Sequence, residues 1–125
     1  MRHAIAAIFL VALAFFGVAA DKTMQQPLVR IAELEIDPGQ LPAYLDALKE
    51  EISASLRDEP GVLMLYAVAV KDHPNQIRIV ETYADQAAYE SHLQTAHFRK
   101  YKTDTRNMVK SLRLVETVPI LLGTK

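Results

Sequence analysis

The chain has 125 residues, and its 14 basic and 15 acidic side chains give a formal net charge of −1. This near-neutral balance argues against a nucleic-acid-binding protein, which would carry an excess of basic residues. The sequence contains no cysteine, so disulfides, thiolate nucleophiles and cysteine-ligated metals are excluded. The length suits a single domain with a modest core.

The N-terminus predicts a secretory signal peptide. Met1–His3 is a short basic start, Ala4–Ala20 is an uncharged apolar run, and the small residues before Asp21 suit a signal peptidase. An uncleaved membrane anchor is the alternative, but the run is at the short limit for a membrane span. We therefore expect cleavage near Ala20. For a bacterial source this predicts a periplasmic or secreted protein that is not attached to a membrane after cleavage.

The rest of the chain is predicted to be a flexible linker over residues 21–27 and one folded domain over 28–122. Apolar alternation and helical spacing predict a strand over Leu28–Ile36, a helix over Gln40–Asp58, strands over Val62–Val70 and Gln76–Tyr83, a helix from Gln86 to about Val109, and a strand over Leu112–Leu122. Turn signals separate the first four elements: Asp37-Pro38-Gly39, Glu59-Pro60-Gly61 and Lys71–Asn75. The second helix either continues through Thr95 or breaks there. Pro119 should place the last strand at an edge or bulge.

The order β-α-β-β-α-β predicts an α+β, ferredoxin-like split β-α-β fold. Such a fold is a four-stranded antiparallel sheet with two helices on one face. The segment Val62–Val70 is apolar throughout, which is typical of a strand covered on both faces. Because the helices cover only one face of the sheet, we expect a second copy of the chain to cover the other. The sequence therefore predicts a homodimer formed through the sheet.

The stretch Ile77–Tyr101 concentrates the candidate functional residues. Glu81 and Tyr83 alternate with aliphatic residues on one face of a predicted strand. Tyr89 and His92 fall on one stripe of the following helix. Thr95 is placed to cap a further helical turn that carries three more candidates: His97, Phe98 and Tyr101.

Each candidate has a functional and a structural interpretation. A buried Glu81 would have a raised pKa and could act as a general base, or it could simply bond backbone groups or His92. His92 and His97 are the best acid–base candidates, with His92 first, although packing or capping would also explain either. Tyr83, Tyr89 and Phe98 would line a pocket or fill the core.

A metal site is not expected from the spacing of these histidines. His92 and His97 are five residues apart, which places them some 140° apart around a continuous helix. No third ligand has a suggestive spacing. Six basic residues follow closely, and they indicate either attraction of an anionic ligand or membrane surface or, as we favour, a solvated helix face: Arg99, Lys100, Lys102, Arg106, Lys110 and Arg113.

The segment Val80-Glu81-Thr82-Tyr83, followed by Tyr89, His92, Thr95 and His97-Phe98, resembles the antibiotic biosynthesis monooxygenase (ABM) superfamily. The resemblance implies a dimeric α+β barrel with a pocket between helices and sheet in each subunit. It also implies an oxidoreductase related to quinol and polyketide monooxygenases, which use molecular oxygen without metal, flavin or haem. Other members of the superfamily degrade haem, and others have no known catalysis.

The sequence departs from the haem-degrading branch of that superfamily at three places. The branch uses an axial histidine a few residues beyond the position of His97, where this chain has Tyr101 and Lys102. It uses an asparagine near the first strand, where this chain offers Glu33 and Glu35, and a tryptophan at the position of Tyr83. Haem cleavage is therefore not expected.

The leading hypothesis is an exported, homodimeric monooxygenase that needs no cofactor. It would oxidise a small quinol-like or polyphenolic aromatic with molecular oxygen. His92 would handle the proton, and Glu81 would orient or charge it. Tyr83, Tyr89, His97 and Phe98 would shape the substrate pocket. The alternatives are a non-catalytic module that binds a small apolar ligand, favoured by an apolar cavity, and a structural dimer, favoured by a filled cavity.

Overall fold

A computed structural model describes residues 26–125. Its elements are β1 (Leu28–Ile36), the short 3-10 helix η2 (Pro38–Gln40), α1 (Leu41–Asp58), β2 (Val62–Val70), β3 (His73–Tyr83), α2 (Gln86–Leu93), α3 (Ala96–Thr105) and β4 (Val109–Glu116). The predicted signal peptide and most of the predicted linker lie outside the described residues.

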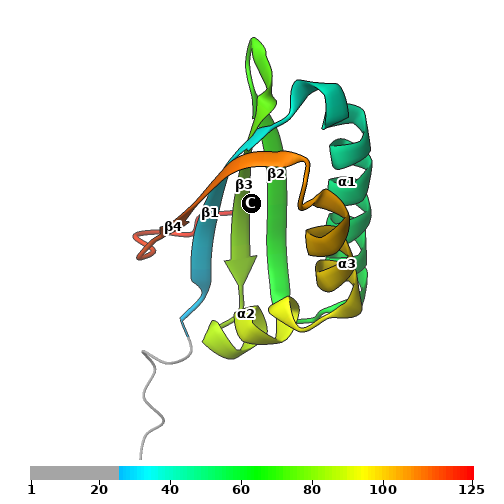
Figure 1. The fold of residues 1–125 in the computed structure, drawn as a ribbon. Coiled ribbons are helices and arrows are strands. Elements are labelled where there is room, and N and C mark those ends of the chain that lie inside the picture. The colour runs from blue at the N-terminus through cyan, green and yellow to red at the C-terminus, as the bar shows by residue number, and fades with distance from the viewer. Residues whose placement is uncertain (1–25) are drawn as a thin grey trace, which may run out of the picture.

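The four strands form one antiparallel sheet in the order β2-β3-β1-β4. Figure 1 shows α1 and α3 side by side over one face of this sheet, with α2 at its lower end. The predicted α+β, ferredoxin-like fold is confirmed. The second predicted helix consists of two helices, α2 and α3, because the helical conformation is interrupted between Leu93 and Ala96.

The predicted boundaries of three elements were wrong: the third strand, the last helix and the last strand. β3 begins at His73 rather than Gln76, because Lys71 and Asp72 alone make the hairpin turn and Asp72 adopts the left-handed conformation (φ 67°) that aspartate tolerates. The last helix ends at Thr105, and β4 spans Val109–Glu116 rather than Leu112–Leu122. The strand ends before Pro119, which has no N–H group to donate to a ladder.

The core lies between the sheet and the helices. Its buried members come from β1, β3 and α1: Ala32, Leu34, Ile36, Ile77, Ile79, Tyr44 and Leu48. The hydroxyl groups of Tyr44 and Tyr101 are 2.8 Å apart and hydrogen-bonded, which ties α1 to α3.

Among residues 26–125, no helix lies over the second face of the sheet (Figure 1). In β2, Tyr66 is 64% exposed and Val68 is 56% exposed, and both point away from Leu65, which faces the helices and is buried. The expectation that β2 is covered on both faces is therefore not met within a single chain, and coverage by a second copy stays a prediction. Across residues 26–125, no helix is long and apolar enough to span a membrane.

Candidate active site

A cavity of about 470 Å³ lies between the sheet and the helices. Five of the six predicted site residues line it: Glu81, Tyr83, Tyr89, His92 and Phe98. The rings of Tyr83 and His92 have centroids 5.3 Å apart, and the His92 and Phe98 centroids are 5.0 Å apart. His97 does not line this cavity and contacts the site through Glu59.

Two capping residues place His92 and His97 on separate short helices. The Asp85 carboxylate accepts a hydrogen bond from the Ala88 N–H at 2.8 Å and starts α2. The Thr95 hydroxyl oxygen accepts from the Phe98 N–H at 3.2 Å and starts α3. The same hydroxyl donates to the carbonyl oxygen of His92 at 2.8 Å, so Thr95 also holds the end of α2.

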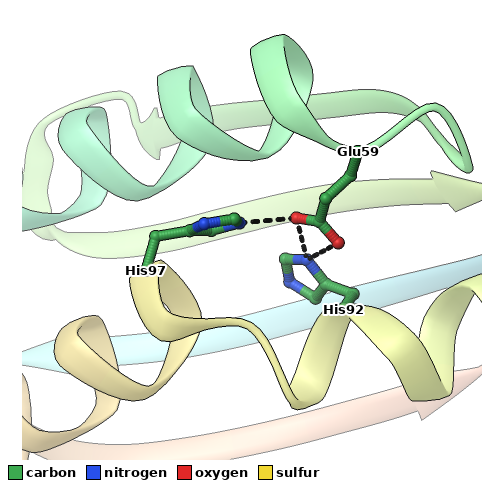
Figure 2. Close-up of side chains that lie close together, drawn as sticks. All are labelled: Glu59, His92 and His97. Atoms are coloured by element: carbon green, nitrogen blue, oxygen red, sulfur yellow. Dashed lines mark hydrogen bonds and ion pairs between the residues drawn. The ribbon is translucent and has the colours of Figure 1, made fainter.

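The break between the helices brings the two imidazoles together on Glu59. The Glu59 Oε2 atom lies 2.9 Å from His92 Nδ1 and 2.6 Å from His97 Nε2, as Figure 2 shows. On one continuous helix these histidines would point some 140° apart. The change of direction at Thr95 is therefore what allows both rings to reach one carboxylate.

The hydrogen bonds to Glu59 determine which ring nitrogens carry protons. Burial raises the pKa of Glu59, but the hydrogen bonds from His97 and His92 outweigh this effect and leave its pKa below the ordinary value. Glu59 is therefore an ionised acceptor, and both histidines donate to it. This fixes the His92 proton on Nδ1 and leaves Nε2 to exchange a proton on the other side of the ring.

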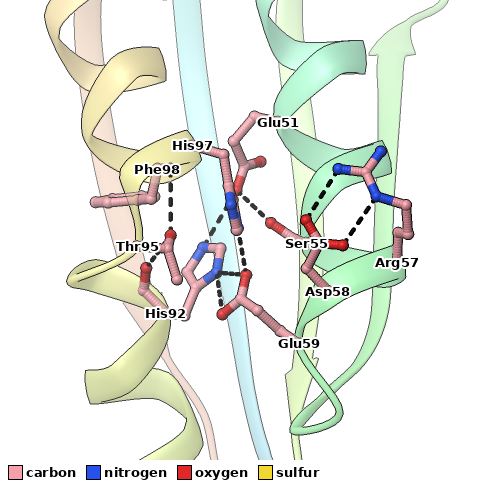
Figure 3. Close-up of polar contacts among 9 residues, drawn as sticks. All are labelled: Glu51, Ser55, Arg57, Asp58, Glu59, His92, Thr95, His97 and Phe98. Atoms are coloured by element: carbon pink, nitrogen blue, oxygen red, sulfur yellow. Dashed lines mark hydrogen bonds and ion pairs between the residues drawn. The ribbon is translucent and has the colours of Figure 1, made fainter.

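A second carboxylate, Glu51 of α1, faces that other side. Its Oε1 atom lies 3.4 Å from His92 Nε2 and accepts a hydrogen bond from the Ser55 hydroxyl at 2.8 Å (Figure 3). Burial raises the pKa of Glu51. His92 thus lies between the ionised carboxylate of Glu59 and the carboxyl group of Glu51, which holds a proton more readily. This arrangement can relay a proton.

Glu81 is the cavity carboxyl group whose pKa changes most, because burial raises it to about 7. Its cross-strand neighbour Arg30 does not neutralise it, since Arg30 forms an ion pair with Glu116 at 3.3 Å and lies over the Tyr89 ring at 4.3 Å. The Tyr83 hydroxyl is buried and lies close enough to Glu81 to oppose the rise in the pKa of that carboxyl, but it meets the geometry of a hydrogen bond with none of the described residues. A carboxyl group that titrates near neutrality and an unpaired hydroxyl therefore share one cavity.

The matching family model is "antibiotic biosynthesis monooxygenase", over residues 27–104. The chain belongs to this family. Its structure is similar to that of a Bacteroides thetaiotaomicron protein provisionally named an antibiotic biosynthesis monooxygenase. The two are 50% identical with a TM-score of 0.78, and the match covers 82% of this chain and 97% of the other.

Two further ABM-like structures resemble this chain less closely. A Lactobacillus acidophilus protein provisionally named a monooxygenase is 29% identical with a TM-score of 0.71, and the match covers 72% of this chain but 43% of that longer one. A Nitrosomonas europaea protein is 18% identical with a TM-score of 0.72, covering 77% and 92% of the two chains, and shows the fold alone. No curated protein matches this ABM chain.

Sequence reasoning missed two acids of this ABM site. Glu59 was interpreted only as part of the helix stop Glu59-Pro60-Gly61, and no spacing relates it to histidines 33 and 38 residues away. Glu51 and Ser55 carried a signal, because they continue the buried stripe of Tyr44 and Leu48 at helical spacing. A polar pair on an otherwise apolar stripe indicates a buried polar partner, which here is His92.

Glu81 was predicted to orient or charge His92, but Glu59 and Glu51 are the acids that lie beside His92. Among residues 26–125, Glu81 makes no hydrogen bond to His92, and the carboxylates beside the ring belong to Glu59 and Glu51. The triad of Glu59, His92 and His97 also presents three potential metal-ligand atoms within 4.8 Å of one another. Sequence spacing offered no third ligand for the two histidines, and Glu59 supplies a potential one from the end of α1.

Proposed function

We propose that this chain is an exported, homodimeric monooxygenase that oxidises a quinol-like or polyphenolic aromatic with molecular oxygen and needs no cofactor. The observation that carries the proposal is the unpaired, buried Tyr83 hydroxyl beside Glu81 in an aromatic-walled cavity. A buried polar group without a partner is costly, so such a site favours a ligand that supplies the missing hydrogen bond. A phenolic hydroxyl would do so.

The reaction balances without any group beyond substrate and oxygen. A benzene-1,4-diol and O2 give a hydroxybenzoquinone and water, so the substrate supplies all four electrons. One oxygen atom forms a bond to ring carbon and the other leaves as water. The residues of the chain would bind and orient the diol, exclude water and take the phenolic proton. Loss of that proton raises the electron density of the ring, which favours electron transfer to O2.

Glu81 and His92 are the groups proposed to handle that proton. The pKa of Glu81, about 7, lets the carboxylate accept a proton from a bound phenol and release it near neutrality. His92 Nε2 faces Glu51, which gives the proton a second acceptor away from the ring of the substrate. Glu59 and His97 would act as positioning residues, because they hold His92 and do not line the cavity.

The open cavity argues against the two non-catalytic alternatives. A structural dimer would fill the cavity with its own side chains, whereas here about 470 Å³ remains. A binding module for an apolar ligand would have an apolar cavity, whereas this one holds Glu51, Glu81 and His92 among its walls. Converging polar groups in an open cavity support an enzyme.

Oxygen consumption with a panel of hydroquinones tests the proposal. The purified protein, dialysed against chelator, should consume oxygen faster than the autoxidation blank, and His92→Ala should lower the rate at least tenfold. The matched control is His73→Ala, since His73 is an exposed histidine at the β2–β3 turn. Uptake no faster than the blank across the panel would reject the oxygenase in favour of the binding module.

The homodimer is proposed to form through the uncovered face of the sheet. Tyr66 and Val68 are exposed there, and Val118, Ile120 and Leu121 beyond β4 are at least 85% exposed, which is costly for apolar side chains in water. Light scattering should give twice the chain mass, and a Val68→Asp substitution should yield monomers. A Leu56→Asp control on α1 should stay dimeric. A monomeric wild-type protein would reject this interface.

A further inference from the structure

Three basic residues line one end of the cavity: Lys102, Arg106 and Lys110. We call them the cationic rim. Lys102 falls on the stripe of α3 that faces the cavity, together with Phe98, Tyr101 and buried Thr105, and Arg106, the C-cap of α3, continues this stripe. Lys110 is on β4 and lines the same cavity, at the register shift where the pairing with β1 passes from Glu35–Ser111 to Ile36–Val109.

The cationic rim is the unpaired half of a longer basic run. Lys100 forms ion pairs with Glu50 and Asp104, both at 3.2 Å, and Arg113 pairs with Glu33 at 3.4 Å. Arg99 donates to the Gln94 side chain at 2.6 Å. No rim residue forms an ion pair within residues 26–125. Lys110 contributes to lowering the pKa of Asp37, but the carboxylate of Asp37 accepts hydrogen bonds from Gly39 and Gln40.

A solvated helix face does not account for this placement. Cations near the C-terminus of α3 would be favourable there on any side of the helix. Lys102 and Arg106, however, occupy the cavity-facing side, whereas Arg99 and Lys100 occupy the outer side. The helix dipole also cannot explain Lys110, which belongs to a strand. Three cations from two elements converge on one cavity.

The cavity is consequently polarised along its length. Glu81 lies opposite Arg30 near one end of β1, whereas Val109, next to Lys110, lies opposite Ile36 at the other end. Six residues of strand separate these levels, which is about 20 Å of backbone. The long side chains of the rim shorten this distance, since Lys102 lies one helical turn from Phe98. Aliphatic walls connect the two ends, among them Leu48, Ile79 and Leu114.

We propose that the cationic rim binds an anionic substituent of the ligand, so that the substrate class is an aromatic diol carrying a carboxylate or a similar anion. The diol would occupy the end with Glu81 and Tyr83, and the anion would extend to the rim. Only the diol part of this ligand rests on the proposed function. The anionic substituent, and the direction in which the ligand lies in the cavity, rest on the position of the cationic rim.

The proposal is tested by binding in the absence of oxygen. The probes are a 1,4-hydroquinone that carries a heptanoate side chain, 7-(2,5-dihydroxyphenyl)heptanoate, and its neutral methyl ester. They share the diol and the aliphatic spacer that lets the carboxylate reach the rim, and they differ in one charge. Calorimetry with the purified full chain should show the acid binding about tenfold more tightly than the ester, with the preference falling at high salt. An exposed charge pair raises binding affinity a few-fold, and the three cations of the rim would act together on the one anion.

Two triple variants localise the effect. Lys102→Met, Arg106→Met and Lys110→Met together remove the charge and keep the apolar stems, and should abolish the preference for the acid. The control combines Arg99→Met, Lys100→Met and Arg113→Met, which removes the same charge from the same run and should preserve the preference. In turnover with the acid, the rim variant should raise KM and leave kcat nearly unchanged.

The possible outcomes separate this proposal from the proposed function. Preferential binding of the acid without oxygen uptake would support the rim and reject the oxygenase. Oxygen uptake with equal binding of acid and ester would reject the rim and retain the oxygenase. A preference that survives in the rim variant, or failure of both probes to bind, would overturn the rim proposal. Rim-dependent binding to vesicles of anionic phospholipid, with no preference between probes, would instead assign these cations to a membrane surface.

Discussion

Replacing Glu81 with glutamine should make the protein more stable at neutral pH and less active. Burial raises the pKa of this carboxyl from its ordinary value of 4.5 to about 7. The charged groups that face it are Arg30 from β1, Glu51 from α1 and His92 from α2. Because burial outweighs the attraction of Arg30 and His92, the native protein disfavours the ionised form. Glutamine keeps the shape of the side chain and removes the ionisation.

The magnitude follows from linkage between protonation and folding. Below about pH 4.5 the carboxyl is protonated in both the folded and the unfolded chain, so it contributes no difference. Between pH 4.5 and 7 only the folded chain keeps the proton, so the free energy of unfolding decreases as pH rises. Above pH 7 the full penalty is about 3 kcal/mol, at about 1.4 kcal/mol for each pH unit between the two pKa values.

Urea denaturation of both proteins at several pH values measures this penalty. The stability of Glu81→Gln relative to wild type should rise between pH 4.5 and 8, by an amount approaching 3 kcal/mol. Oxygen uptake should be lost in the same variant, and wild-type activity should increase through pH 7 as Glu81 ionises. A relative stability that is constant with pH, or that falls as pH rises, would refute the reasoning about Glu81.

Two local contacts give further predictions. A Cβ atom at Gly61 would lie 2.5 Å from the Ala88 Cβ atom, so Gly61→Ala should cost about 1–3 kcal/mol in urea denaturation, whereas Gly39→Ala, with only an ordinary contact, should cost far less. Equal costs would contradict the close packing of α2. Thr95→Ala should cost about 1 kcal/mol and shift the imidazole NMR signals of the site, and Thr95→Ser should restore both. Unchanged imidazole signals in the alanine variant would show that the cap does not position the histidines.

The sequence was most informative where a residue's role depends on its neighbours along the chain. Alternation placed β1, a continuous apolar run placed β2, and the shared period of Glu81 and Tyr83 placed both on the cavity side of β3. The strand β4 was shifted because its start depends on pairing with β1 rather than on its own apolar pattern. Such pairing has no local signature.

The sequence placed the aromatic residues of the site, His92 and Glu81 but missed the two acids beside His92, Glu51 and Glu59. Glu59 ends α1, and the signals around it, a proline and a glycine, concern the backbone alone. Its side chain acquires a role only when α1 packs beside α3, which brings it to residues more than 30 positions away. The division of the basic run was likewise hidden, because the partners of Lys100 and Arg113 come from α1 and β1.

The interruption at Gln94 and Thr95 has a consequence for engineering this protein. Substituting residues of higher helix propensity there is a usual way to raise thermal stability. In this chain it would favour fusing α2 and α3 into one rod, and His97 would rotate away from the carboxylate that it shares with His92. A variant with one regular helix here would therefore lose the shared contact of His92 and His97 with Glu59. Heat-stable variants should be sought on the outer surface of α1, with this junction kept as it is.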